Sequence, residues 1–86
     1  MLIHSPRNLA HYYRDQRKER GVTQVAVSEE IAVRQDTISK FENKPDNVRL
    51  DTLFKLLSAL DLELHIISKN PSDLADSKKA EWSEQW

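Results

Sequence analysis

The stretch from Thr23 to Asn43, TQVAVSEEIAVRQDTISKFEN, constrains the fold most, because it has the pattern of two short amphipathic helices joined by a tight turn. Thr23 stands at an N-cap position, where its hydroxyl can accept a hydrogen bond from a helix N–H group. Gln24 then begins the first helix. Val27 and Ile31 lie four residues apart and form one apolar stripe on it.

The apolar pattern breaks over residues 32–34, and a new stripe begins at Ile38 and Phe41. A second helix is therefore predicted from about Gln35 to Asn43, ending before Pro45, since the residue before a proline avoids the helical region. Two helices of about two turns each are too short to be stable alone. They need further elements on which to pack.

The flanking segments supply such elements. Ser5 and Pro6 have the residue types preferred at an N-cap and at the first helical position, and Gly21 is a helix terminator. Residues 45–47 predict a turn, and residues 50–60 predict a strongly apolar helix. The chain of 86 residues is thus expected to be mainly α, with four to five helices around one core. The predicted core residues are Tyr13, Val27, Ile31, Val33, Ile38, Phe41, Leu53, Leu57 and Leu60.

The segment Leu62 to Ser68 alternates apolar and polar residues for most of its length, which predicts a short β-strand. The sequence has no second strand with which it could pair. A lone strand edge is unstable, so the simplest partner is the same strand of another copy. We therefore predict a homodimer in which Leu62, Leu64 and Ile66 lie at the dimer contact. The alternative is a short packed extension of the preceding helix.

The phrase T-Q-x-x-V-S-x-x-I-A-V-x-Q-x-T-I-S-x-F-E-N resembles the helix-turn-helix of the phage-repressor (Cro/C1, or XRE) family, and the resemblance covers roughly residues 5–62. It departs from the usual pattern at Val27 and Ser28, which replace Leu-Ala, and at Ala32, which replaces the glycine of the turn. The resemblance implies a lambda-repressor-like domain that binds double-stranded DNA. It also implies that Arg17 and Glu42 form a partly buried ion pair.

The charge distribution fits this expectation better than the net charge does. The formal net charge is only -1, which by itself argues against a nucleic-acid partner. Residues 1–44, however, contain eight Lys and Arg against six Asp and Glu, whereas residues 45–86 contain five against eight. The basic side chains thus concentrate in the part that carries the motif, as expected for a surface that meets phosphates.

The second helix would lie in the major groove of DNA with its N-terminal residues at base edges. Gln35 suits adenine N6 and N7, Arg34 suits guanine O6 and N7, and Asp36 can accept from cytosine N4. The predicted base contacts are Arg34, Gln35, Asp36, Ser39 and Lys40. The predicted phosphate contacts are Thr23, Gln24, Asn43 and Lys44, with Gln24 at a helix N-terminus that favours an anion.

Residues 69–86 are rich in Ser, Asp, Lys and Glu and are expected to form a loosely held tail after a domain of residues 1–68. The tail contains both tryptophans, Trp82 and Trp86, which would suit a pocket of another protein, although Trp82 could also fold back onto the domain. Motif, strand and tryptophan-ended tail together resemble the HipB antitoxin family. That resemblance implies a dimeric repressor that binds palindromic operators in its own promoter and holds a HipA-like serine/threonine kinase toxin inactive.

Other classes of protein find little support. The chain has no cysteine, and its three histidines have no metal-ligand spacing, so neither a metal or cofactor site nor an enzyme is expected. No run is long enough to span a membrane, so a cytoplasmic, nucleoid-associated protein is expected. Two alternatives are a helix-turn-helix that serves as a protein-interaction adaptor and an unrelated XRE-family repressor without a toxin partner. Salt-dependent binding to duplex DNA would separate the adaptor from the repressor.

Overall fold

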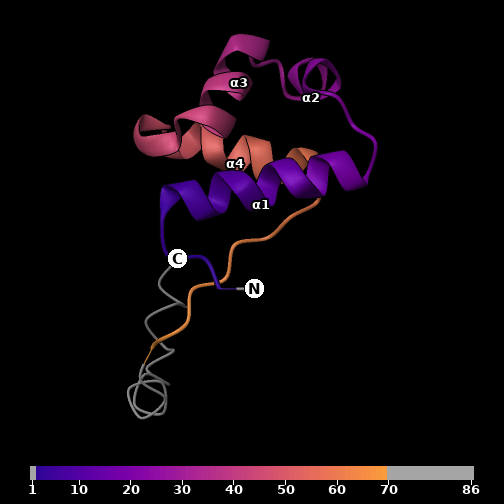
Figure 1. Ribbon diagram of the computed structural model, residues 1–86. Helices are drawn as coiled ribbons and strands as arrows, with labels where there is room; N and C mark the ends of the chain where they lie inside the picture. Colours follow the sequence, from indigo (N-terminus) through magenta and orange to yellow (C-terminus); the bar gives the residue numbers. More distant parts are fainter. Residues whose placement is uncertain (1, 70–86) are drawn as a thin grey trace, which may run out of the picture.

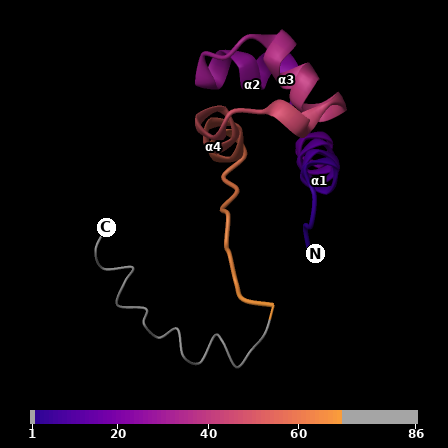
Figure 2. The same ribbon diagram turned by 90° about the vertical axis from the view of Figure 1, so that its left-hand side faces the viewer.

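The structure, a computed structural model, describes residues 2–69. They contain α1 (Pro6–Glu19), α2 (Gln24–Ile31), α3 (Gln35–Asn43) and α4 (Leu50–Ala59), with one turn of 3-10 helix, η1 (Pro45–Asn47), before α4. In Figure 1, α1 and α4 run in similar directions; Figure 2 shows both end-on, with α2 and α3 lying across them. The mainly helical fold is confirmed, and the turn predicted at residues 45–47 is η1. No helix in the described part is long and apolar enough to cross a membrane.

The ends of α1 lie where the sequence places them. The Ser5 hydroxyl oxygen accepts a hydrogen bond of 3.1 Å from the N–H of Asn8, and Pro6 occupies the first helical position, where its missing N–H costs nothing. The helix ends at Glu19, and Gly21 follows with a φ of 69°, a conformation that glycine adopts without strain. These short-range signals therefore set the length of α1.

The turn between α2 and α3 keeps its shape although it lacks a glycine. Thr23 caps α2 through a 3.0 Å hydrogen bond from the N–H of Ala26, as predicted. At the other end Ala32 adopts a left-handed conformation, with φ 54° and ψ 43°, and its N–H bonds to the carbonyl of Ser28. A residue with a Cβ in this region costs roughly 1–2 kcal/mol. The rest of the packing stabilises the turn against that cost.

The core lies where α1, α3 and α4 meet under α2. Tyr13, Phe41, Ile38, Leu56 and Val27 are its largest fully buried side chains. Most of the predicted core is confirmed, but Ile31 and Val33 were wrongly placed in it, since they are only partly buried at its edge. Ala10 and Leu56 are buried although the sequence analysis did not name them. Leu56 lies beside Leu57 on α4, which packs against α2, and the Tyr13 hydroxyl of α1 donates to the Leu56 carbonyl.

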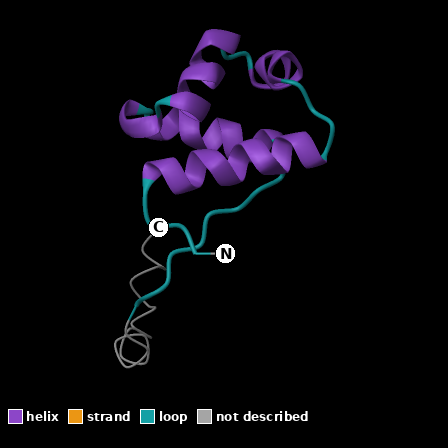
Figure 3. Cartoon of the chain, in the orientation of Figure 1, coloured by secondary structure: helices purple, strands orange, loops and turns teal. Residues whose placement is uncertain are grey.

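The chain after α4 is extended but does not form a strand within residues 2–69 (Figure 3). Leu62 still packs against the core, whereas Leu64, Ile66 and Ile67 are 46%, 87% and 68% exposed. A strand exists only through hydrogen bonds to a second strand, and none lies within the described residues. The strand and its pairing across a dimer therefore stay predictions. The tail of residues 70–86, with Trp82 and Trp86, lies outside the described residues.

Candidate nucleic-acid interface

One face of α3 points away from the core and carries the residues predicted to read bases. Gln35, Asp36 and Lys40 are exposed and Ser39 is half-buried, whereas Ile38 and Phe41 are buried against the rest of the bundle. This division follows from helical geometry, because residues three and four apart share a face. α3 thus presents a continuous polar surface of about two turns.

Arg34 lies just before this surface rather than on it. It is the N-cap residue of α3, has an extended backbone with φ -65° and ψ 142°, and its side chain makes no capping hydrogen bond. The residue is exposed. Its side chain therefore extends from the start of the helix, the end at which a recognition helix meets base edges.

The C-terminal end of α3 holds Asn43 and Lys44. The Asn43 amide donates to the carbonyl and to the hydroxyl oxygen of Ser39, at 2.9 and 3.3 Å. Lys44 follows as an exposed residue and makes the turn toward η1. Asn43 is therefore held against the same helix face as Ser39.

The start of α2 lies against the start of α3. The Gln24 side chain donates from Nε2 to Oε1 of Glu42 at 3.0 Å, and its Oε1 accepts from Nε2 of Gln35 at 3.4 Å. Thr23 remains exposed beside it, with its oxygen engaged in the helix cap. Gln24, predicted as a phosphate contact, and Gln35, predicted as a base contact, are thus hydrogen-bonded to each other.

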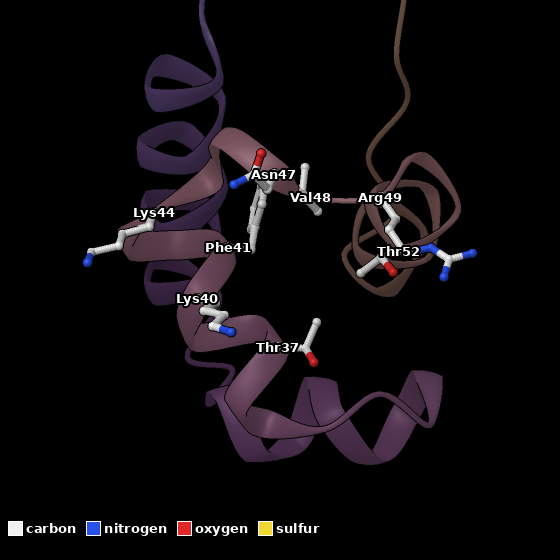
Figure 4. A pocket seen from close by; sticks show the side chains of 8 residues that line it. All are labelled: Thr37, Lys40, Phe41, Lys44, Asn47, Val48, Arg49 and Thr52. Carbon is white, nitrogen blue, oxygen red and sulfur yellow. The ribbon is translucent and has the colours of Figure 1, made fainter.

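A groove of about 320 Å³ runs along α3 on the side facing α4 (Figure 4). Lys40 and Lys44 border it from α3, and Arg49 borders it from the start of α4. Phe41 and Val48 provide apolar surface. The full lining is Thr37, Lys40, Phe41, Lys44, Asn47, Val48, Arg49 and Thr52. Asn47, Arg49 and Thr52 were not predicted as site residues, although a basic residue just before a helix was a signal for Arg49.

A second hollow lies at the start of α2 and has a volume of about 490 Å³. Arg17 and Lys18 of α1 line it on one side, and Thr23 and Gln24 line it at the first turn of α2. The first N–H groups of any helix lack partners inside it and carry partial positive charge. With Lys18 exposed nearby, the surface around this hollow is suited to an anion.

Beneath this surface, Arg17 and Glu42 form a two-pronged ion pair. Arg17 Nε lies 2.7 Å from Oε2 of Glu42, and Nη2 donates to Oε1 at 2.9 Å; Nη1 also donates to the carbonyl of Val22 at 2.9 Å. Only 9% of the Arg17 side chain and 2% of the Glu42 side chain are exposed. The hydrogen bond to Glu42 raises the pKa of Arg17, and burial opposes that shift.

Tyr13 joins this buried group from α1. Its hydroxyl donates to the carbonyl of Leu56 at 2.8 Å, and its ring meets that of Phe41 edge to face at 5.5 Å. The pKa of Tyr13 is raised to about 12, mainly by burial and also by the charge of Glu42, while the charge of Arg17 opposes the shift. Tyr13, Arg17 and Glu42 together fasten α1 to the end of α3.

The predicted site residues thus form two separate groups. The residues proposed for bases and phosphates lie on α3, at its ends and at the start of α2, on neighbouring parts of the surface. Leu62, Leu64 and Ile66 lie elsewhere, on the extended segment after α4. Trp82 and Trp86 lie outside the described residues.

Two helices joined at Ala32, the second exposing a polar face beside basic side chains, are the arrangement of a helix-turn-helix DNA-binding protein. The helix-turn-helix family model matches residues 14–67. The chain is also 39% identical over 82 residues to Antitoxin HipB of Escherichia coli strain K12, and the match covers 93% of each chain. It belongs to the HipB family of antitoxins.

Solved structures agree with this assignment. A HipB–O4 20-mer complex and a HipA–HipB–O2–O3 complex each match with a TM-score of 0.79 and 38% sequence identity. Each match covers 81% of this chain and 99% of the matched chain. The similarity therefore extends over nearly the whole of each solved HipB chain.

Proposed function

We propose that this protein is a dimeric transcriptional repressor that binds operator DNA in its own promoter and acts as the antitoxin of a HipA-like serine/threonine kinase. The match to HipB over 93% of both chains carries the proposal, together with a helix that exposes only polar residues on one face. Such a protein would act in the cytoplasm, on the nucleoid.

In this function α3 enters the major groove. Gln35 pairs with adenine N6 and N7, Arg34 reaches guanine from the start of the helix, and Asp36 accepts from cytosine. Ser39 and Lys40 follow one turn further along the same face. Each good bidentate pair contributes about 1–3 kcal/mol of discrimination against a wrong base.

The flanking surfaces bind the phosphates. Thr23 and the first N–H groups of α2 contact one phosphate, with Lys18 beside them, while Asn43 and Lys44 contact another. Arg49 is a further phosphate contact, because it lies on the wall of the groove opposite Lys40 and Lys44. Gln24 contributes mainly through its backbone N–H, because its side chain is bonded to Glu42 and Gln35.

Dimerisation places two reading helices on one DNA. The extended segment exposes Leu64, Ile66 and Ile67, and the same segment of a second copy would cover them. Two copies of α3 would then meet major grooves about one helical turn apart. This geometry fits a palindromic operator.

The tail supplies the contact with the toxin. Trp82 and Trp86 are large aromatic side chains of the kind that anchors an interface when it fills a pocket of the partner. A tail that binds the kinase leaves α3 available for DNA. One dimer can therefore hold operator and toxin together.

A fluorescence-anisotropy titration with duplex DNA from upstream of the gene tests the DNA-binding half of the proposal. Affinity should fall steeply as salt rises, because phosphate contacts release counterions. Arg49→Ala should weaken binding to all sequences alike and reduce the slope of log affinity against log salt by about 1. Binding that is insensitive to salt would contradict a phosphate-contacting repressor and favour an adaptor.

Co-purification tests the antitoxin half. The full chain should retain the kinase encoded beside it and suppress its activity, whereas Trp86→Ala should lose most of that retention. The same variant should bind operator DNA with unchanged affinity, which shows that the domain is intact. Retention of the kinase by Trp86→Ala at wild-type strength would contradict the proposed role of the tail.

A further inference from the structure

One face of α1 carries a line of exposed basic side chains. Arg7, His11, Arg14 and Lys18 lie three or four residues apart, so they share one side of the helix, and all four are exposed. These four residues form a basic stripe. No salt bridge within residues 2–69 involves Arg7, Arg14 or Lys18. The stripe therefore presents three positive charges that are not bound in ion pairs there.

The stability of α1 does not account for this arrangement. Arg7 stands in the first turn, where the partial positive charge of a helix N-terminus disfavours a cation, and that turn has no acidic residue. Arg14 and Lys18 lie four residues apart, a spacing at which like charges destabilise a helix, and only Lys18, in the last turn, gains from the helix dipole. Asp15 and Glu19, the acidic residues of α1, each follow a basic residue directly and therefore lie on an adjacent side. The charges of the stripe thus favour a role in binding.

The stripe begins at the surface proposed to meet DNA and leads away from it. Lys18 lines the hollow at the start of α2 together with Gln24 and Gln35. Arg20, two residues after Lys18, lies on the opposite flank of α1, because each residue turns a helix by about 100°. Its guanidinium donates to the carbonyl of Leu60 at the end of α4. The stripe therefore lies on the flank of α1 that faces away from α4 (Figure 2).

In the proposed dimer this flank stays uncovered. The extended segment that would join the two copies leaves from the end of α4, and the stripe lies on the other side of α1. From Arg7 to Lys18 the stripe is roughly 16 Å long, at about 1.5 Å per residue of helix. This length matches about five nucleotides of one DNA strand, which follow each other every 3.4 Å or so along the helix axis.

We propose that the basic stripe binds phosphates of the duplex DNA that flanks the operator half-site, so that each subunit covers more DNA than its reading helix does. This inference rests on the proposed DNA-binding function. A row of separate cations suits a row of separate anions, and such contacts to phosphates carry no information about the base sequence. Each contact would release about one counterion, so the flanking DNA would add to the salt dependence of binding and not to its specificity.

The test compares two duplexes by fluorescence anisotropy at several salt concentrations. The first is the shortest duplex on which the wild type still discriminates operator from random sequence, and the second extends it at one end by about ten base pairs, one helical turn. On the extended duplex, Arg7→Gln/Arg14→Gln should bind about tenfold more weakly than wild type at low salt, with a slope of log affinity against log salt that is shallower by about 2. On the shortest duplex the two proteins should bind alike, since Lys18 is unchanged.

Three further variants serve as controls, each with a thermal melt to show that it is folded. Arg14→Lys keeps the charge and should bind both duplexes as the wild type does. Arg14→Gln alone should produce about half of the change in slope. Arg49→Gln removes a cation that lines the groove beside α3, and should weaken binding to both duplexes alike.

The outcomes separate this inference from the proposed function. Equal affinity and slope of the wild type and Arg7→Gln/Arg14→Gln on the extended duplex would overturn the inference, as would equal losses on both duplexes. Salt-dependent discrimination on the shortest duplex would still support the proposed function in either case. Loss of the kinase in co-purification, without any change on the extended duplex, would also overturn the inference and would assign the stripe to the contact with the toxin.

Discussion

The helix α4 and the extended segment that follows it both contain many large apolar residues, but they bury them to very different extents. In α4, Leu53, Leu56 and Leu57 are between 0% and 7% exposed, whereas Ile66 and Ile67 in the segment are 87% and 68% exposed. A helix satisfies its own backbone and needs a partner only for one face. An extended segment needs a partner for its backbone as well, and no second strand lies within residues 2–69. The inward face of α4 is therefore covered within the described residues, whereas the apolar side chains of the segment are exposed.

The largest expected effect comes from breaking the buried ion pair within the bundle. Glu42→Ala leaves the Arg17 guanidinium buried without its carboxylate, and should lower the free energy of unfolding by about 3–5 kcal/mol. Urea denaturation followed by circular dichroism measures it. Arg49→Ala is the control, because it removes an ion pair with Asp51 in which both side chains are well exposed, and stability should stay unchanged. Equal losses in the two variants would show that the buried pair has no special role.

A smaller effect on stability distinguishes α4 from the extended segment that follows it. Leu56→Ala should lower the free energy of unfolding by about 2–5 kcal/mol at any protein concentration, because it leaves a cavity inside one chain. Ile66→Ala should leave a dilute sample unchanged and lower the thermal midpoint only where the wild type is dimeric. Melts at several concentrations, together with light scattering, measure both. A monomeric wild type at micromolar concentration would contradict the paired strand.

The smallest of the three effects is a dependence on pH confined to the bundle. The pKa of Tyr13 is raised to about 12 from its ordinary value of 10.0, mainly by burial. The folded state therefore favours the neutral phenol of Tyr13. Its contribution to the free energy of unfolding is fully present below pH 10 and is lost as the pH rises toward 12. The loss should be on the order of 2–3 kcal/mol. Tyr13→Phe lacks the phenol, and its alkaline loss should be smaller by that amount. Parallel alkaline curves for the two proteins would contradict this assignment.

Much of the fold follows from the sequence because helix ends depend on residues within four positions. Ser5, Thr23 and Gly21 have the predicted places, and Ala32 adopts the left-handed conformation that the motif requires. The resemblance to known repressors also implied the ion pair between Arg17 and Glu42. The core was predicted less well, since Leu56 is fully buried but was not predicted to be, whereas Ile31 and Val33 were predicted in the core and are only partly buried.

The candidate site was predicted as a set of residues but not as a set of contacts. Gln35 and Gln24 were placed on the surface that meets DNA, yet their bond to each other and to Glu42 was not foreseen. Arg49, which lines the groove, was not named, although its place just before a helix was a local signal for it. The contacts of Gln24 join residues far apart in the chain, so no local pattern reveals them.

The sequence by itself determined where the four helices begin and end, because caps, turn residues and apolar spacing act over one or two turns. It also predicted that residues 62–68 form a strand that pairs with the same strand of a second copy. Only the tertiary structure decided which side chains meet. Glu42 contacts Arg17 and Gln24 across separations of 25 and 18 residues. Such contacts depend on how whole helices pack, and that packing joins the buried Glu42 carboxylate to Gln24 at the surface proposed to meet DNA.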